Sequence, residues 1–440
     1  MKGHSRSVYG GTLLSLAMVL TLGVLIASAH DRVRTVVVDC TEGRTIAHAL
    51  ERGDEDKPLV VIVRGMCHEN VVIDRDDVTL QGDTSGGGVT GLDPTKDTIL
   101  IEGARRVGIE NLTVSGGGNG IAFIQGSSGT VDNCIVQNTG GHGVRIEGAS
   151  ATVINSTISF NHVAGIMLQD GGNGRIGITN SNQYAGNTIN SNGGTGIHLQ
   201  YGATAAIGGN TITGNGTDPN TVIDRSGIAL YTATGVVVGN NSITGNQGAG
   251  IIARSSGLRI GDPSFNLSQV NTISGNGIAT SEGGVFALVG TGLDIRHATI
   301  SGNTGTGVTG QQGSSVRIRD STINDNAGGG VVAFVGTALD LQNTTISDNT
   351  ALGTSIAAVG VALSTRSVAR IRGGSIQNND LDGISLVLGS GLFLQSPAVS
   401  VTGNGGFGLS CDGNESSYSG NTSGIVDNGL GPISNNCTGF

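Results

Sequence analysis

Residues 211–215 have the sequence TITGN, and the chain repeats this motif as SITGN at residues 242–246 and as TISGN at residues 272–276 and 299–303. The shared element is an apolar residue followed three positions later by Asn, and it occurs eleven times at intervals of 23 to 31 residues. Such a period is typical of a solenoid, in which one supersecondary unit stacks on copies of itself. The apolar residues are Ile135, Ile158, Ile189, Ile212, Ile243, Ile273, Ile300, Ile323, Ile346, Ile376 and Val401. The asparagines are Asn138, Asn161, Asn192, Asn215, Asn246, Asn276, Asn303, Asn326, Asn349, Asn379 and Asn404.

Each unit contains two more short apolar stretches. A Gly followed by an apolar residue comes about eight positions after the motif, as in Gly196-Ile197, and an alternating triplet such as Leu258-Arg259-Ile260 follows. Alternation of apolar and polar residues at period two indicates half-buried strands. Three strands in about 23 residues predict a three-sided coil whose sides pair in parallel with the next coil.

This pattern resembles the right-handed parallel β-helix repeat proteins of the pectin-lyase-like superfamily, over nearly all of the chain after residue 29. The resemblance implies an all-β fold: a single-stranded right-handed parallel β-helix, or solenoid, of about twelve three-strand coils with an N-terminal capping helix. We expect that helix at residues 45–50 and the first strands at residues 59–63, 71–73 and 78–80. The superfamily contains lyases, hydrolases, epimerases, adhesins and non-enzymes, so it does not fix an activity.

The N-terminal segment predicts export. Lys2 and Arg6 precede a largely apolar run at residues 13–26, and Ala27-Ser28-Ala29 is a cleavage site. We therefore expect a secreted or periplasmic protein, cleaved near Ala29, with no membrane span in the mature chain. The expected organisation is a signal peptide at 1–29, a cap and first coils at 30–110, β-helix repeats at 111–410 and a C-terminal coil or cap at 411–440.

Composition limits the partners. The chain has 78 Gly among 440 residues, 3% aromatic residues and a formal net charge of −10. Abundant Gly suits short strands joined by tight turns, and the acidity argues against nucleic acid as a partner. Cys40 and Cys67 are about one coil apart, as are Cys411 and Cys437, so we expect a disulfide at each end. We expect the fifth cysteine, Cys134, to be a buried free thiol.

Two sets of polar residues have structural interpretations. Stacked identical asparagines hydrogen-bond along a solenoid axis, so the Asn ladder is expected to be structural. The outward residues of the third strand alternate in charge, which predicts ion pairs between coils; they are Arg259, Asp294, Arg317, Asp340 and Arg370. A second, basic column is expected to be a solvated face; it comprises Arg296, Arg319, Gln342 and Arg372.

The outward face of the second strand is the predicted site. Carboxylate, Arg and Tyr side chains gather there on five neighbouring coils, beside an inserted loop at residues 216–225, a combination suited to sugar hydroxyl and uronate groups. The predicted substrate-binding residues are Arg145, Glu147, Asp170, Gln200, Asp224, Arg225, Tyr231 and Arg254. Farther along, the same columns become apolar, which predicts a covered face or a homo-oligomer contact through Phe286, Leu288, Val332 and Phe334.

Catalytic motifs of the superfamily are largely missing. Gly141-His142-Gly143 matches the G-H-G of polygalacturonases, but its partner elements are absent and the same slot is repeat consensus elsewhere. Asp93-Pro94 lacks the His of the epimerase motif. A lyase needs a base and a cation beside the uronate; the hypothesis that follows from the columns is His198 as base and Tyr201 as acid. We identify no metal site and expect no cofactor. Calcium stays open as an alternative without a clear site, since no convincing trio of Asp lies on adjacent coils.

The leading hypothesis is an exported protein that recognises an extracellular or envelope polysaccharide through the second-strand face, with catalysis left open. One alternative is a polysaccharide lyase, epimerase or glycoside hydrolase. The other is a non-catalytic structural or adhesive surface rod. Paired carboxylates on the second-strand face would favour the enzyme, and an oligomer buried along its apolar half would favour the rod.

Overall fold

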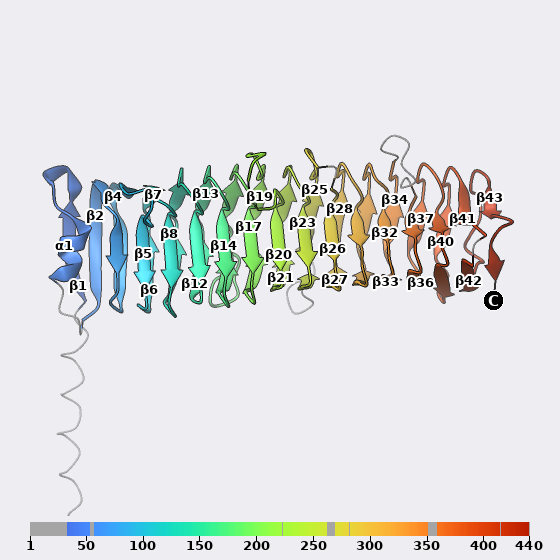
Figure 1. Cartoon of the computed structure of the whole chain (residues 1–440), viewed down its shortest axis with the longest axis horizontal. Coiled ribbons are helices and arrows are strands. Elements are labelled where there is room, and N and C mark those ends of the chain that lie inside the picture. The colour runs from blue at the N-terminus through green and yellow to red at the C-terminus, as the bar shows by residue number, and fades with distance from the viewer. Residues whose placement is uncertain are drawn as a thin grey trace, which may run out of the picture.

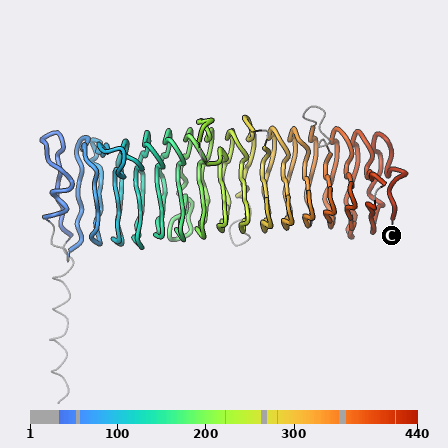
Figure 2. Tube along the Cα trace, in the orientation of Figure 1, coloured from blue at the N-terminus to red at the C-terminus, as the bar shows by residue number. Residues whose placement is uncertain are grey.

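The computed structural model describes residues 33–52, 57–221, 223–261, 269–280, 282–350, 359–413 and 415–439. The chain winds into an elongated stack of coils, with the short helix α1 (Ile46–Glu51) at one end and the C-terminus at the other (Figures 1 and 2). All neighbouring named strands pair in parallel and most keep an unbroken register, as in Ile189 with Ile212 and Ile212 with Ile243. Two pairings contain a register shift, one after Val63 and one after Ile207. The predicted parallel β-helix is confirmed.

Three faces run the length of the stack. The ladder face carries the apolar-x-x-Asn motif, and its strands are β7 (Thr113–Gly116), β10 (Ile135–Gln137), β13 (Thr157–Ser159), β16 (Thr188–Asn190), β19 (Thr211–Thr213), β22 (Ser242–Thr244), β25 (Asn271–Ser274), β28 (Ala298–Ser301), β31 (Thr322–Asn324), β34 (Thr345–Ser347), β37 (Ser375–Gln377) and β40 (Ser400–Thr402). The second-strand face comprises β3 (Val71–Ile73), β5 (Ile99–Glu102), β8 (Ile121–Ile124), β11 (Val144–Glu147), β14 (Ile166–Gln169), β17 (Ile197–Gln200), β20 (Ile228–Tyr231), β23 (Ile251–Arg254), β26 (Val285–Leu288), β29 (Val308–Gly310), β32 (Val331–Ala333), β35 (Val361–Leu363), β38 (Ile384–Leu386), β41 (Phe407–Cys411) and β43 (Gly431–Ile433). The third-strand face comprises β1 (Arg34–Asp39), β2 (Leu59–His68), β4 (Val78–Gly91), β6 (Val107–Glu110), β9 (Ser128–Asp132), β12 (Ser150–Ile154), β15 (Asn173–Ile176), β18 (Thr204–Gly208), β21 (Thr234–Gly239), β24 (Gly257–Ile260), β27 (Gly292–Arg296), β30 (Ser315–Arg319), β33 (Ala338–Gln342), β36 (Val368–Arg372), β39 (Gly391–Gln395), β42 (Ser417–Gly420) and β44 (Thr438–Gly439).

The stack is longer than the sequence motif indicates. The second-strand face has 15 strands among the described residues, where the sequence predicted about twelve coils. The additional strands lie at the two ends of the stack. At the N-terminal end, β3, β5 and β8 come before the first copy of the apolar-x-x-Asn motif. At this end the long strand β4 spans two faces, because it pairs with β6 on the third-strand face and with β7 on the ladder face.

The N-terminal cap agrees closely with its prediction. Helix α1 begins after Thr45, whose hydroxyl accepts a hydrogen bond from the His48 amide, and the Glu69 carboxylate accepts from the first two helical amides, those of Ile46 and Ala47. Helix and strand β1 thus cover the first coil, which would otherwise expose an apolar end. Among the described residues, no helix is long and apolar enough to cross a membrane. The predicted signal peptide lies outside the described residues.

Inward-facing Ile, Val and Leu side chains fill the core. The ladder isoleucines from Ile158 to Ile323 are fully buried, and a disulfide closes each end: Cys40 with Cys67, and Cys411 with Cys437. The predicted pairing of the cysteines is therefore observed. Cys134 is a buried free thiol, as expected, and burial raises its pKa to about 12.

Ten of the eleven predicted asparagines form one buried ladder. From Asn161 onward each side-chain amide donates to the Asn Oδ1 of the next coil at 2.8–3.1 Å, and the ladder continues beyond Asn404 to Asn428. Asn428 was missed, although Ile425 precedes it at the right spacing. A second ladder, also missed, joins Asn187, Asn210, Asn241 and Asn271 at the opposite end of the same strands.

The first predicted rung is wrong by one residue. Val136, not Ile135, is in register with Ile158, and Ile135 is 44% exposed. Thr139 therefore takes the ladder position, where its hydroxyl donates to Asn161 Oδ1 at 2.9 Å, and Asn138 is exposed. Two apolar residues are adjacent there; only Ile135 has an Asn three positions later, but the chain buries Val136.

Candidate functional site

The outward side chains of the second-strand face form two columns over strands β11 to β23. Glu147, Gln169, Gln200, Tyr231 and Arg254 are paired in register from coil to coil in one column. Because alternate residues of a strand face the same side, a parallel column starts at Arg145 and passes through Met167 to His198. The structure thus brings together most of the polar residues that the sequence singled out on this face.

A row of hydrogen bonds joins the first three members of that column. Gln169 Nε2 donates to Glu147 Oε2 at 3.0 Å, and Gln200 Nε2 donates to Gln169 Oε1 at 3.1 Å. All three side chains are half-buried. The row therefore presents fixed amide and carboxylate groups along the helix axis.

Arg145 anchors the start of the row. Its guanidinium donates to Glu147 and to Asp97 Oδ2, the latter at 3.0 Å, and Asp97 also accepts from Asn119 Nδ2 at 2.7 Å. Sequence analysis missed Asp97 and Asn119, which occupy the corner position before strands β5 and β8. Both are polar residues two positions before a strand, and the alternation that identifies outward side chains applies only within a strand.

The predicted acid–base pair is not assembled. His198 is 2% exposed, its ring stacks on that of Tyr231 with centroids 5.4 Å apart, and neither ring nitrogen has a hydrogen-bond partner of good geometry among the described residues. Burial lowers its pKa to about 4, with a small opposing effect of Gln200. Tyr201 is 63% exposed at the corner after β17, in the left-handed region at φ 52°. Tyr231 of the next coil, rather than Tyr201, is the aromatic partner of His198.

Acidic groups gather at the other end of the row. Burial raises the pKa of Asp224 to about 6, and the nearby Glu282 carboxylate adds to the rise, while Ser226 and Arg254 oppose it. Glu282 Oε2 accepts from the Ala249 amide at 3.2 Å. Sequence analysis identified Asp224 but missed Glu282, which comes from a different inserted loop. The exposed Arg254 lies 6.0 Å from the centre of the Tyr231 ring.

Arg225 and Asp170 have more peripheral positions. Arg225 Nε donates to the carbonyl of Gly216 at 2.7 Å, so this side chain closes its own loop. Asp170 is exposed at the corner after β14.

His142 belongs to the repeat rather than to a cluster of acids. Its Nδ1 accepts a hydrogen bond from the Ala164 amide at 3.2 Å, and its own amide donates to Asn119. Burial lowers its pKa to about 4, and the positive charge of Arg145 and the neighbouring His198 act in the same direction. These contacts fit the interpretation of Gly141-His142-Gly143 as repeat consensus.

The apolar half of the second-strand face is partly buried by its own side chains. Leu288 is 9% exposed and Val332 is 3% exposed, while Phe286 and Phe334 are half-buried. Leu288 packs with Ile252 and two alanines in a small external cluster beneath Phe286 and Tyr231. The homo-oligomer contact through these four apolar residues stays a prediction.

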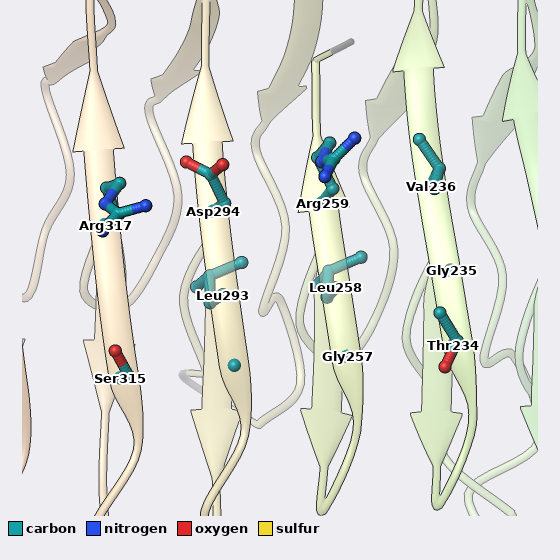
Figure 3. Close-up of a pocket in the computed structure, with 11 residues that line it drawn as sticks. Thr234, Gly235, Val236, Gly257, Leu258, Arg259, Leu293, Asp294, Ser315 and Arg317 are labelled. Carbon is teal, nitrogen blue, oxygen red and sulfur yellow. The ribbon is translucent and has the colours of Figure 1, made fainter.

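Among the described residues, one group has three potential metal ligands close together: Cys40, Cys67 and Glu69. Both sulfurs are in the disulfide and Glu69 caps α1, so this group is not available to a metal. Two hollows lie elsewhere, on the third-strand face. Figure 3 shows residues that line the first of them, among them Gly257, Asp294 and Arg317.

Comparison with known proteins agrees with this architecture. The family model for the right handed beta helix region matches residues 97–180, 142–267 and 222–367, which together span more than half of the chain. The protein therefore belongs to the right-handed β-helix family, and the predicted handedness follows. No curated protein sequence matches the chain.

Solved structures with a similar course include a pectate lyase, at 12% identity over 60% of this chain and 78% of that one, with a TM-score of 0.40. A periplasmic alginate epimerase shares 12% identity over 76% of this chain and 83% of that one, with a TM-score of 0.43. The A-module of an Azotobacter vinelandii mannuronan C-5 epimerase shares 14% identity over 90% of each chain, with a TM-score of 0.34.

Proposed function

We propose that this protein recognises a polysaccharide through the second-strand face. The observation that carries the proposal is the hydrogen-bonded row from Glu147 to Gln200, which continues into the half-buried Tyr231 ring and the exposed Arg254. Amide and carboxylate groups match sugar hydroxyls, an aromatic face matches a pyranose ring, and a guanidinium matches a uronate.

The dimensions of the row favour a polymer over a small ligand. Successive coils are about 4.8 Å apart, so the five members from Glu147 to Arg254 span about 19 Å along the axis. An elongated row of this kind contacts several consecutive units of one chain. We propose that the protein acts outside the cytoplasm, because its two disulfides require an oxidising compartment.

Calorimetric titration with neutral and uronic-acid oligosaccharides tests this function. Tyr231→Ala removes the ring face and is expected to weaken binding about tenfold, since a central aromatic contact is typically worth more than 1 kcal/mol. Phe393→Ala is the matched control, because Phe393 is a 45% exposed aromatic residue on the third-strand face. Equal affinity of the wild type and Tyr231→Ala for every ligand that binds would refute the role of this face.

Hydrolysis of the bound glycan is the second candidate, favoured by the raised pKa of Asp224 beside Glu282. A carboxyl group that titrates near pH 6 is suited to protonate a leaving oxygen, and a second carboxylate is suited to activate water. Release of reducing ends from the same glycans, abolished in Asp224→Asn, would support this activity. Release of unsaturated products instead, detected by ultraviolet absorbance, would indicate a lyase and contradict it.

A further inference from the structure

A cleft lies at the N-terminal end of the stack, away from the proposed polysaccharide site on strands β11 to β23. It has a volume of about 630 Å³, within the range of ligand sites, and it is lined by β1 and α1, which Figure 1 shows at this end. The helix contributes a stripe of residues three and four positions apart, which lie on one face: Thr45, His48, Ala49 and Arg52. The strand contributes the three consecutive residues 36–38. Because consecutive side chains point to opposite faces of a strand, a cleft that all three line follows the edge of β1.

The outer edge of β1 has unpaired main-chain groups. Among the described strands, β1 pairs with β2 alone, and on that side the Arg34 amide donates to the Pro58 carbonyl at 2.9 Å. Successive residues of a strand direct their amide and carbonyl groups to opposite edges, so the main-chain groups of Thr35 and Val37 face away from β2. Neither residue has another main-chain partner among the described residues. Such an edge is a template for an added strand.

The two ends of the stack differ in the protection of their edges. At the C-terminal end, β43 has three residues, one of which is Pro432, and β44 has two. Short edge strands and proline prevent further strands from pairing. Strand β1 has six residues and no proline, its only charged residues are at its two ends, and Val37 is 40% exposed. The N-terminal edge therefore lacks the protection that the C-terminal edge has.

The ionisable side chains that line the cleft are three arginines and a histidine, without an acid. Arg44 is paired with Glu42 at 3.1 Å. Arg34 Nη1 donates to the main-chain carbonyl of Arg52 at 2.6 Å, which places these two residues side by side. Neither of their guanidinium groups has a carboxylate partner among the described residues. The cleft thus presents two uncompensated cations beside the free edge, an arrangement complementary to carboxylates.

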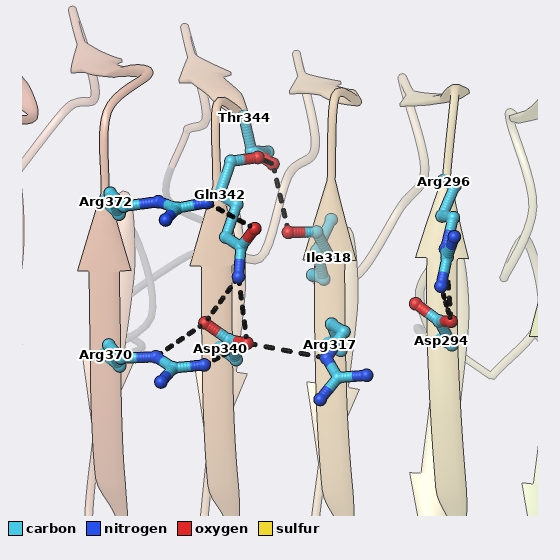
Figure 4. A network of polar contacts seen from close by, with 9 residues as sticks. All are labelled: Asp294, Arg296, Arg317, Ile318, Asp340, Gln342, Thr344, Arg370 and Arg372. Carbon is cyan, nitrogen blue, oxygen red and sulfur yellow. Dashed lines mark hydrogen bonds and ion pairs between the residues drawn. The ribbon is translucent and has the colours of Figure 1, made fainter. Parts of the chain in front are cut away.

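On the third-strand face, by contrast, most arginines find a carboxylate within the chain (Figure 4). Asp340 lies between Arg317 at 3.4 Å and Arg370 at 2.7 Å, so the predicted ion pairs between coils form there. Asp294 instead accepts two hydrogen bonds from Arg296 of its own strand, at 3.1 and 2.8 Å. These arginines obtain their partners from the same or the next coil, which the two free arginines of the cleft do not.

We propose that the cleft accepts an extended acidic segment of a partner protein, which adds to β1 as a further strand. The main chain of this segment bonds to the free amides and carbonyls of Thr35 and Val37. Its apolar side chains pack against Ala49 on the helix stripe, and its carboxylates meet Arg34 and Arg52. Six residues of β1 span about 20 Å, so about six residues of the segment become ordered. A small organic anion would satisfy the guanidinium groups but not the row of main-chain groups.

Calorimetric titration of the full chain with a blocked nine-residue peptide tests this proposal. In the peptide, three Val alternate with two Thr between two pairs of Asp, and two comparison peptides have Asn or Lys in place of Asp. We expect the Asp peptide to bind at least tenfold more tightly than the Lys peptide, with a smaller difference at high salt. Hydrogen exchange followed by mass spectrometry should show slower exchange within residues 34–39 when the Asp peptide is bound, because the peptide pairs with the outward amides.

A matched pair of variants tests strand addition itself. Val37→Pro removes an outward amide hydrogen without removing a bond to β2, a position where an edge strand tolerates proline, and Val37→Thr keeps that hydrogen. We expect Val37→Pro to weaken binding of the Asp peptide about tenfold and Val37→Thr to leave it unchanged. If Val37→Pro fails to fold, as judged by circular dichroism, a second pair decides. Arg52→Gln should weaken binding about fivefold, whereas Arg259→Gln, which changes another exposed arginine on the distant strand β24, should not.

Four results would overturn the proposal. Equal affinity of the three peptides would exclude an acidic partner. Equal binding by the two members of either variant pair would exclude the cleft. Slow exchange of the Thr35 and Val37 amides in the free chain would show that another part of the chain already covers the edge. Self-association in sedimentation that Val37→Pro abolishes would replace the partner by a second copy of this chain. The second-strand face is not involved in these measurements, so the proposed function depends only on its own titration.

Discussion

Removal of one buried amide from the Asn ladder should destabilise the whole rod. Asn246 is fully buried, its Nδ2 donates to Asn276 Oδ1 at 2.9 Å and to the Ile212 carbonyl at 3.2 Å, and its Oδ1 accepts from two nitrogens of Asn215. In Asn246→Ala, the Asn215 amide hydrogen and one hydrogen of its side-chain amide lose their acceptor. A buried donor without an acceptor costs about 1–3 kcal/mol, so we expect a loss of about 3 kcal/mol in the free energy of unfolding.

The control is Asn138→Ala, which changes the same residue type at the one predicted ladder position that the structure leaves exposed. That variant should lose about 1 kcal/mol or less, because an exposed Asn in the left-handed region contributes only its conformational preference. Guanidinium unfolding followed by far-ultraviolet circular dichroism measures both changes. If the two variants lost the same stability, the ladder would not hold the coils together and the reasoning would be refuted.

Other predictions concern buried groups and the ends of the stack. Cys134, whose pKa of about 12 keeps it protonated, should react with iodoacetamide only after unfolding, as read by mass spectrometry; labelling of the native chain would contradict its burial. The pKa of His198 is lowered to about 4, so its contribution to stability is present above about pH 6.5 and is lost as the pH falls toward 4; His198→Phe should flatten the acid side of the melting-temperature profile. Burial raises the pKa of Asp224 to about 6, so the stability linked to its neutral form is greatest below about pH 3.8 and declines as the pH rises through 6. Asp224→Asn should remove that decline from the melting-temperature profile. An unchanged profile would contradict the burial of this carboxyl group. The double variant Cys411→Ser, Cys437→Ser opens a loop of 26 residues and should cost about 3 kcal/mol, seen as faster hydrogen exchange in the last coils, whereas uniform exchange would show that the staple is dispensable.

The sequence predicted the fold well because each coil repeats the same inward positions. Ile212 and Ile243 are interchangeable members of one column, so a period is enough to assign their faces and their partners. The error at Ile135 arose where two apolar residues are adjacent: Ile135 satisfies the motif, whereas Val136 is the residue in register with Ile158 and buried. The end coils were undercounted because β3 belongs to a unit without the Asn motif and because the copy of the motif from Ile425 to Asn428, which precedes β43, was missed.

The candidate site was predicted less completely, for a physical reason. The columns of a parallel stack follow from the period, so the row of Glu147, Gln169 and Gln200 was within reach. The contacts of a side chain with the next coil could not be predicted in this way. The ring that stacks on His198 is that of Tyr231, while Tyr201 is exposed.

Residues contributed by corners and separate inserted loops, such as Asp97 and Glu282, follow no strand alternation and were missed.

A crystal structure of the protein soaked with the tightest-binding oligosaccharide of the panel tests the central claim most directly. The account predicts sugar rings along the second-strand face, with one ring against Tyr231 and polar contacts to Gln200 and Arg254. Oligosaccharide density confined to other faces, or no density at concentrations that saturate the protein in solution, would contradict recognition through this face.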